Sequence, residues 1–114
     1  MAYDEELAHR VRELLAEETG VSEKAMFGGL AFLLNGNMAV SCSRRGGLMV
    51  RIAPQESEKA LARPHTQLIE MRGRRMPGWI HVAPEGVKDK RQLGAWVRRG
   101  VEFAGSLPAK GRAR

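Results

Sequence analysis

The stretch of residues 26–38 constrains the fold of this chain more than any other part of the sequence. Its apolar run is broken by a double glycine at 28–29 and ends in an Asn-Gly-Asn turn at 35–37. Asparagine and glycine tolerate the positive φ angles that tight hairpin turns require. We therefore predict a strand over residues 24–34 that reverses into a second strand over residues 37–43. The double glycine then marks a bulge or a close backbone approach within the first strand.

Similar patterns predict the other elements in chain order. A capping aspartate, Asp4, and apolar residues at helical spacing indicate a first helix that ends near Thr19. The further predicted elements are a strand at 48–52, a short helix at 54–61, strands at 67–71 and 79–83 joined by a loop at 72–78, and a helix at 88–106. The order α-β-β-β-α-β-β-α predicts an α+β fold with an antiparallel sheet of five strands.

Gly100 lies on the apolar side of the last predicted helix. A glycine inside a helix costs about 1 kcal/mol relative to alanine. We therefore interpret Gly100 as a position where the backbones of helix and sheet approach each other closely.

Two of the predicted strands are apolar on both faces. Phe32 and Leu33 point to opposite faces of the first strand, and Trp79 and Ile80 do the same in the last. Three helices cover only one face of such a sheet, and large exposed apolar patches usually mark interfaces. We therefore expect a homodimer. The alternative is that loops partly cover the second face of the central strands.

The length and composition fit one globular domain. The chain has 114 residues, of which 43% are hydrophobic and 28% charged. We assign the domain to residues 1–108, and residues 109–114 to a basic tail that we expect to be disordered. Cys42 is the single cysteine, and the acidic N-terminus lacks an apolar signal core. We therefore expect a cytoplasmic protein without disulfides and without a membrane partner.

The net charge of +6 hides an asymmetry, because residues 1–26 carry a net −4 and the rest of the chain a net +10. This uneven distribution of charge is consistent with three interpretations: charge pairing within or between chains, a basic surface that binds an anion such as nucleic acid, or an ordinary solvated surface. Arginine suits phosphate binding, although few aromatic residues are left for base stacking. The candidate residues for contact with an anion or a nucleic acid are Arg44, Arg45, Arg72, Arg74, Arg75, Lys88, Lys90 and Arg91.

Three of these cations, Lys88, Lys90 and Arg91, stand at the start of the last predicted helix. Cations oppose the positive end of the helix dipole by about 0.3–1 kcal/mol each. The helix therefore either starts later than residue 88 or gains stability from an anion.

Residues that support catalysis are scarce. The histidines His9, His65 and His81 have no second histidine or cysteine at the spacing of metal ligands. Cys42 is interpreted as a buried, inert thiol. The two glycine pairs lack the pattern of phosphate-binding loops. We therefore expect no enzyme, no cofactor and no metal; an enzyme that uses His65 or His81 is the alternative.

Six short motifs follow one another in an order and at a spacing typical of one family. They are Met26-Phe27-Gly28-Gly29-Leu30, Gly36-Asn37-Met38, Leu48-Met49-Val50-Arg51, Ala62-Arg63-Pro64-His65, Met76-Pro77-Gly78-Trp79, and a helix from Trp96-Val97 to Phe103-Ala104. Together they resemble the N-terminal domain of the TfoX/Sxy family, over about residues 1–108.

The resemblance implies an α+β fold like that of type III secretion chaperones, in which dimers occur. The family's namesakes are regulators of natural competence that help a cyclic-AMP receptor protein to activate DNA-uptake genes. They carry a second, C-terminal domain, and this chain ends where that domain would begin. The resemblance supplies no catalytic residues; it implies packing roles for Trp79 and Trp96 and buried ion pairs for Arg51 and Arg63.

We favour two hypotheses for the function. The first is a regulatory or protein-interaction module whose partner belongs to the transcription machinery. The second is a basic accessory protein that contacts DNA directly through its arginine-rich loops, with an affinity that falls steeply as salt rises.

Overall fold

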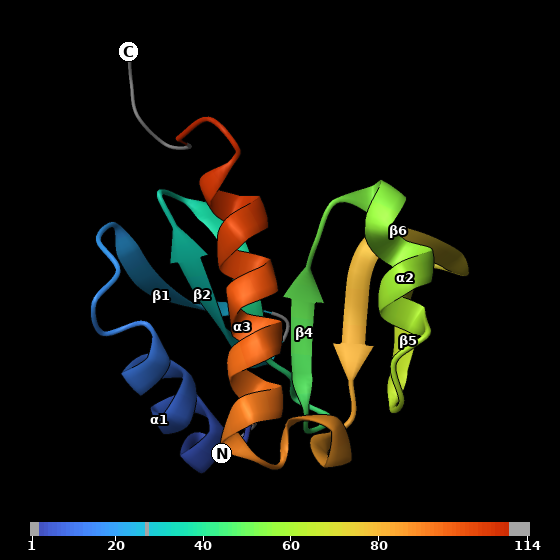
Figure 1. The fold of residues 1–114 in the computed structure, drawn as a ribbon, viewed down its shortest axis with the longest axis horizontal. Coiled ribbons are helices and arrows are strands. Elements are labelled where there is room, and N and C mark those ends of the chain that lie inside the picture. The colour runs from blue at the N-terminus through green and yellow to red at the C-terminus, as the bar shows by residue number, and fades with distance from the viewer. Residues whose placement is uncertain (1–2, 27, 110–114) are drawn as a thin grey trace.

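The computed structural model describes residues 3–26 and 28–109, which form three α-helices and one six-stranded antiparallel sheet (Figure 1). The elements are α1 (Glu5–Leu14), β1 (Val21–Met26), β2 (Gly29–Leu34), β3 (Asn37–Cys42), β4 (Leu48–Arg51), the 3₁₀ turn η1 (Pro54–Glu56), α2 (Ser57–Leu61), β5 (Thr66–Met71), β6 (Arg74–Val82), the 3₁₀ turn η2 (Pro84–Val87) and α3 (Lys90–Gly105). The strand order is β1-β2-β3-β4-β6-β5. The predicted α+β class and antiparallel sheet are confirmed. Of the predicted tail at 109–114, residues 110–114 lie outside the described part of the chain.

The prediction of one strand over residues 24–34 is wrong, because this segment forms the hairpin of β1 and β2. Gly28 adopts a φ of +78°, and Met26 pairs with Gly29 across the turn. The sheet therefore has six strands instead of five. The expected close backbone approach is confirmed at Gly29, where a Cβ atom would collide with the carbonyl oxygen of Cys42.

Helix α1 is shorter than predicted. The Asp4 carboxylate accepts hydrogen bonds from the backbone N–H groups of Glu6 and Leu7 at 3.0 and 3.1 Å, which confirms the expected N-cap. The helix ends at Leu14 and not near Thr19. The acidic side chains of Glu17 and Glu18 would oppose the negative end of the helix dipole there, which disfavours further helical turns.

The predicted loop at 72–78 is also wrong in most of its length. The turn consists of Arg72 and Gly73, with φ angles of +54° and +77°, and β6 begins immediately after it. The pairing register of β5 and β6 then shifts between Leu68 and Glu70. Residues 76–79 of β6 have no pairing partner in β5 at this shift, which is a position where a proline without an N–H is tolerated.

The capped N-terminus of α3 shows where this helix begins relative to Lys88, Lys90 and Arg91. The Asp89 carboxylate accepts a hydrogen bond from the Gln92 backbone N–H at 2.7 Å, and the Gln92 side chain accepts one from the Asp89 N–H. This capping box starts the helix at Lys90. The later start is therefore confirmed and leaves Lys88 before the helix, whereas Lys90 and Arg91 lie in its first turn beside the negative charge of Asp89.

We predict that Asp89→Ala lowers the free energy of unfolding by about 1 kcal/mol, the usual effect of removing an N-cap. The loss leaves the Gln92 N–H without its partner and two cations without a neighbouring acid. Urea denaturation followed by circular dichroism measures the change. Glu102→Ala, on the exposed side of the same helix, is the control. An equal effect of both substitutions would contradict the assigned cap.

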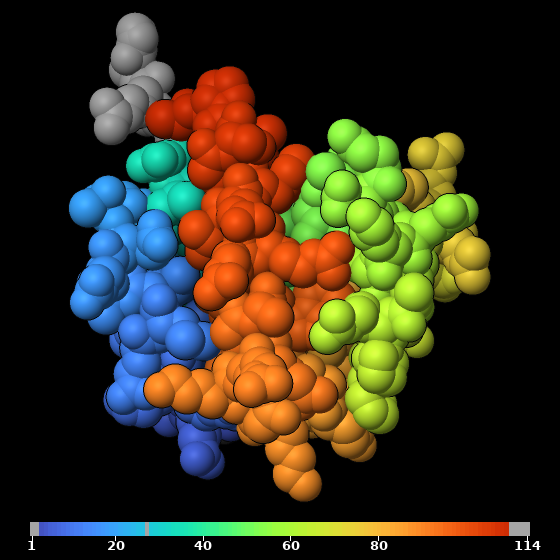
Figure 2. Space-filling view, in the orientation of Figure 1, coloured from blue at the N-terminus to red at the C-terminus, as the bar shows by residue number. Residues whose placement is uncertain are grey.

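The three helices lie on one face of the sheet and enclose the hydrophobic core (Figure 1). Phe32, Leu48 and Ile80 are among the largest fully buried side chains there. Gly100 brings α3 against β3, because a Cβ at this position would lie 2.9 Å from the carbonyl carbon of Ala39. This confirms the close approach predicted at Gly100. Figure 2 shows that the side chains of the helix layer leave little of the sheet visible from this side.

None of the helices in the described ranges is long and apolar enough to span a bilayer.

Candidate interaction site on the open sheet face

The face of the sheet opposite the helices carries one line of paired residues across all six strands. In strand order these are Lys24, Ala31, Ser41, Met49, His81 and Gln67. Directly paired residues share one face of a sheet. Their neighbours Val50 and Ile80 point to the helices and are fully buried. We call the side that carries this line the open face.

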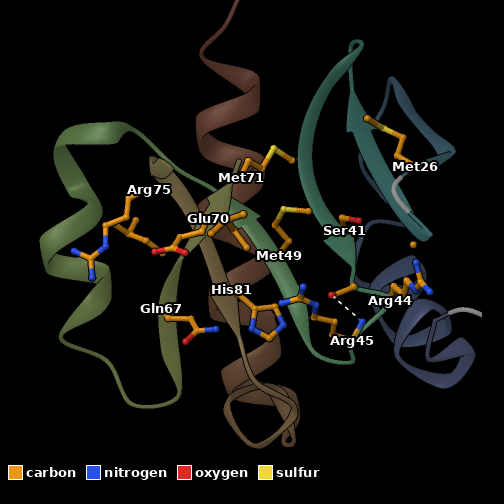
Figure 3. A pocket seen from close by; sticks show the side chains of 14 residues that line it. Met26, Ser41, Arg44, Arg45, Met49, Gln67, Glu70, Met71, Arg75 and His81 are labelled. Carbon is orange, nitrogen blue, oxygen red and sulfur yellow. Dashed lines mark hydrogen bonds between the residues drawn. The ribbon is translucent and has the colours of Figure 1, made fainter. Parts of the chain in front are cut away.

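The open face is hollowed into a cavity of about 1000 Å³. Met49 and His81 lie in its centre, and Met26 and Met71 lie on either side of Met49 along the face (Figure 3). Ser41 is 3% exposed, and its hydroxyl donates a hydrogen bond to the Leu30 carbonyl oxygen at 3.2 Å. The surface is therefore concave and combines apolar with polar groups, as binding surfaces do.

Arginines border this cavity on both sides. Arg44 and Arg45 come from the turn between β3 and β4, and Arg75 comes from β6. Figure 3 shows Arg45 extending toward His81, while Arg44 and Arg75 lie at opposite sides. Glu70 is paired with Arg75 across β5 and β6 and is the one acidic residue of the lining.

The eight cations predicted for anion contact are all exposed, but the structure does not bring them into one patch. The turn with Arg44 and Arg45 lies against Pro84 of η2, just before the start of α3. Arg44, Arg45, Lys88, Lys90 and Arg91 therefore lie at one end of the sheet. Arg72 and Arg74 lie at the opposite end, and Arg75 lies in the cavity. Within residues 3–26 and 28–109, the ion pairs involve none of the eight.

The histidines lie on separate elements. His81 Nε2 is 2.9 Å from the carbonyl oxygen of Gly46, which only accepts, so Nε2 carries the proton and ties β6 to the β3–β4 turn. His65 is exposed, with a φ of +66°. His9 lies on the surface of α1, with its Nε2 atom 3.4 Å from Oε2 of Glu13. These positions give His81 a structural contact and bring no two histidines together.

No group of three or more His, Cys, Asp or Glu side chains in the described residues is arranged to hold a metal ion.

Cys42 belongs to the core and not to the open face. It pairs with Leu30 and Leu48, and its side chain is fully buried. Burial in this apolar environment raises the pKa of the Cys42 thiol to about 12, with a smaller contribution from the charge of Asp4. A nucleophilic cysteine has a lowered pKa, since the thiolate is the reactive form. The buried position expected for this thiol is confirmed.

We predict that iodoacetamide does not label Cys42 in the folded protein at pH 8 and labels it rapidly in urea. Mass spectrometry measures this without ambiguity, since the chain has one cysteine. Folding raises the thiol pKa from 9.0 to about 12. The unfolded chain therefore loses this proton first, and the free energy of unfolding falls as pH rises between these two values. Native labelling at the rate of a free thiol would contradict the assignment.

The ion pairs implied for Arg51 and Arg63 are absent from the described residues. The Arg51 guanidinium lies 5.0 Å from the ring centre of Trp79 and 5.3 Å from that of Phe103. A guanidinium is more weakly hydrated than an ammonium group and stacks well on aromatic rings. Arg51 therefore joins β4 to β6 and α3 through cation–π contacts, and Arg63 is exposed.

The sequence reasoning identified the arginines of the cavity and missed its methionines. The alternation of residues 48–52 places Met49 on the face opposite Leu48 and Val50. The position of Met49 on the open face could therefore have been predicted from the sequence. Met26 and Met71 gave no such signal, because they reach the cavity only through the strand order.

Comparison with known proteins gives one family. The model of the TfoX N-terminal domain matches residues 13–104 of the 114-residue chain. No curated protein and no solved structure matches the chain.

Proposed function

Because this chain belongs to the TfoX N-terminal domain family, we propose that it is a non-enzymatic protein-interaction module that acts in regulation. The domain occurs in competence and transcription regulators, and its family is a regulatory and not a catalytic one. The partner that we propose is a protein of the transcription machinery.

The observation that carries this proposal is the open face of the sheet. The helices cover one face, and on the other the half-buried Met26 and Met49 and the exposed Met71 line a cavity of about 1000 Å³. Exposed apolar surface with a polar border is typical of a protein-binding site. Methionine adapts its shape to a partner, because it is unbranched and flexible.

The expected homodimer remains a prediction of this proposal, as does the likeness to type III secretion chaperones. The edge strands β1 and β5 offer unpaired backbone groups for a second copy. Sedimentation equilibrium of the purified chain tests the dimer: a mass of about twice 12.6 kDa supports it, and a mass of 12.6 kDa contradicts it.

We predict that a partner protein is captured by the wild-type chain and lost with Met49→Asp. An aspartate at the centre of the open face would have to be desolvated on binding, which opposes association. The measurement is affinity capture after nuclease treatment, quantified by mass spectrometry. Ala95→Asp, on the exposed surface of α3, introduces the same negative charge on the helix side and is the control. Capture of DNA with no nuclease-resistant protein would contradict the proposal.

Direct contact with DNA is the second candidate, favoured by the eight exposed cations that make no ion pair among the described residues. Binding of labelled duplex DNA that weakens steeply with salt, and weakens again in Arg44→Ala/Arg45→Ala, would support it. A flat salt response would remove it.

A further inference from the structure

We propose that the open face binds an acidic amphipathic segment of a protein partner, which lies across the strands as a helix. This inference rests on the proposed function and specifies the chemistry of the partner.

The charged side chains around the cavity indicate the charge of the ligand. Arg44, Arg45 and Arg75 border it against one acidic residue, Glu70. All three arginines are exposed, and the ion pairs of the described chain leave them unneutralised. Carboxylates are the natural protein partners of guanidinium groups, because they accept two parallel hydrogen bonds. The face therefore favours a negatively charged ligand.

The apolar part of the same surface decides which kind of anionic ligand fits. Met26, Met49 and Met71 lie among the arginines, and Met71 is 39% exposed. Nucleic acids bind through phosphate contacts and base stacking. Among the described residues that line this cavity there is no Phe, Tyr or Trp on which a base could stack. An acidic peptide with apolar side chains satisfies both halves of the surface.

A second copy of the chain fits this face less well. A two-fold contact places the same patch on both sides of the interface. The interface would then collect Arg44, Arg45 and Arg75 from both chains, with one Glu70 from each chain as the compensating charge. Like charges brought together across an interface disfavour association. A dimer would therefore use another surface and leave the open face to the partner.

The dimensions of the face suit a short helix. The line from β1 to β5 crosses five strand spacings, which is about 24 Å at the usual separation of strands. A helix of roughly 16 residues spans this length. It would cover the methionines with one apolar stripe and direct carboxylates on its flanks to the arginines at both sides of the cavity, in the manner of an amphipathic helix in a groove.

A phage-displayed library of random 16-residue peptides, selected on the full chain, tests the inference. We expect the enriched peptides to be net negative, with apolar residues three and four positions apart. A synthetic enriched peptide is then titrated against wild type and variants by fluorescence polarisation. Arg45→Glu should weaken binding at least about tenfold. Arg91→Glu, an equal charge reversal in the first turn of α3 and outside the cavity, should change it less than about twofold.

The outcomes separate this inference from the proposed function. A selection that enriches no peptides, or neutral or basic ones, overturns the acidic partner, and so does an Arg45→Glu effect no larger than that of Arg91→Glu. If such non-acidic peptides are still lost with Met49→Asp, the open face remains an interaction site. If none of these substitutions changes binding, both the inference and the proposed site fail. Thermal melting of each variant shows that a loss of binding is not a loss of folding.

Discussion

Phe32→Ala should lower the free energy of unfolding by about 3–5 kcal/mol, the usual range for removing a buried aromatic side chain. Phe32 is 1% exposed and lies in the middle of the core on β2. Its removal forfeits the burial of the ring and leaves a cavity that the sheet and helices cannot fill. Domains of this kind are stable by about 5–15 kcal/mol, so the loss is a large part of the total. Urea denaturation at equilibrium measures it.

The neighbouring residue gives the control. Leu33 points to the open face and is only partly buried, so Leu33→Ala should cost clearly less, about 1 kcal/mol. Equal effects of both substitutions would contradict the assignment of one covered and one open face. They would instead indicate that another chain covers Leu33 in solution, which the solution mass would then reveal.

The course of the chain was largely predictable from local patterns, because caps, turns and alternation are properties of a few adjacent residues. Asp4 as N-cap and the Asn-Gly-Asn turn are of this kind. The errors arose where one residue type serves two purposes. A glycine pair suits a bulge and a hairpin turn equally, and only the pairing of Met26 with Gly29 decides for the turn. Similarly, residues 72–78 were predicted as a loop, although most of them belong to β6, where an irregularity in the pairing with β5 accommodates Pro77.

The candidate site was less predictable, because it depends on which strands become neighbours. Met49 and His81 lie side by side only because β6, and not β5, pairs with β4. Nothing in the local sequence specifies this order. The same reason explains why the eight cations, grouped along the sequence, separate to opposite ends of the sheet and into the cavity. Arg51 was misjudged in the same way, since its aromatic neighbours come from β6 and α3.

Gly100→Ala should lower the free energy of unfolding by at least about 2 kcal/mol, although alanine is the better helix former. The added Cβ would lie 2.9 Å from the carbonyl carbon of Ala39 and from Cγ1 of Val40. The closest obstacle belongs to the backbone of β3, which cannot rotate away as a side chain can. Helix α3 would have to move off the sheet, and the core beneath it would lose contacts.

Gly94 lies in the same helix and provides the matched comparison. A Cβ at Gly94 has no atom within 4 Å, so Gly94→Ala should raise the free energy of unfolding by about 0.5–1 kcal/mol. The same substitution at two positions six residues apart in one helix should thus change the free energy of unfolding in opposite directions. If both variants were stabilised, α3 would not lie against β3 as closely as the structure places it, and the helix layer that leaves the opposite face open would have to be reassigned.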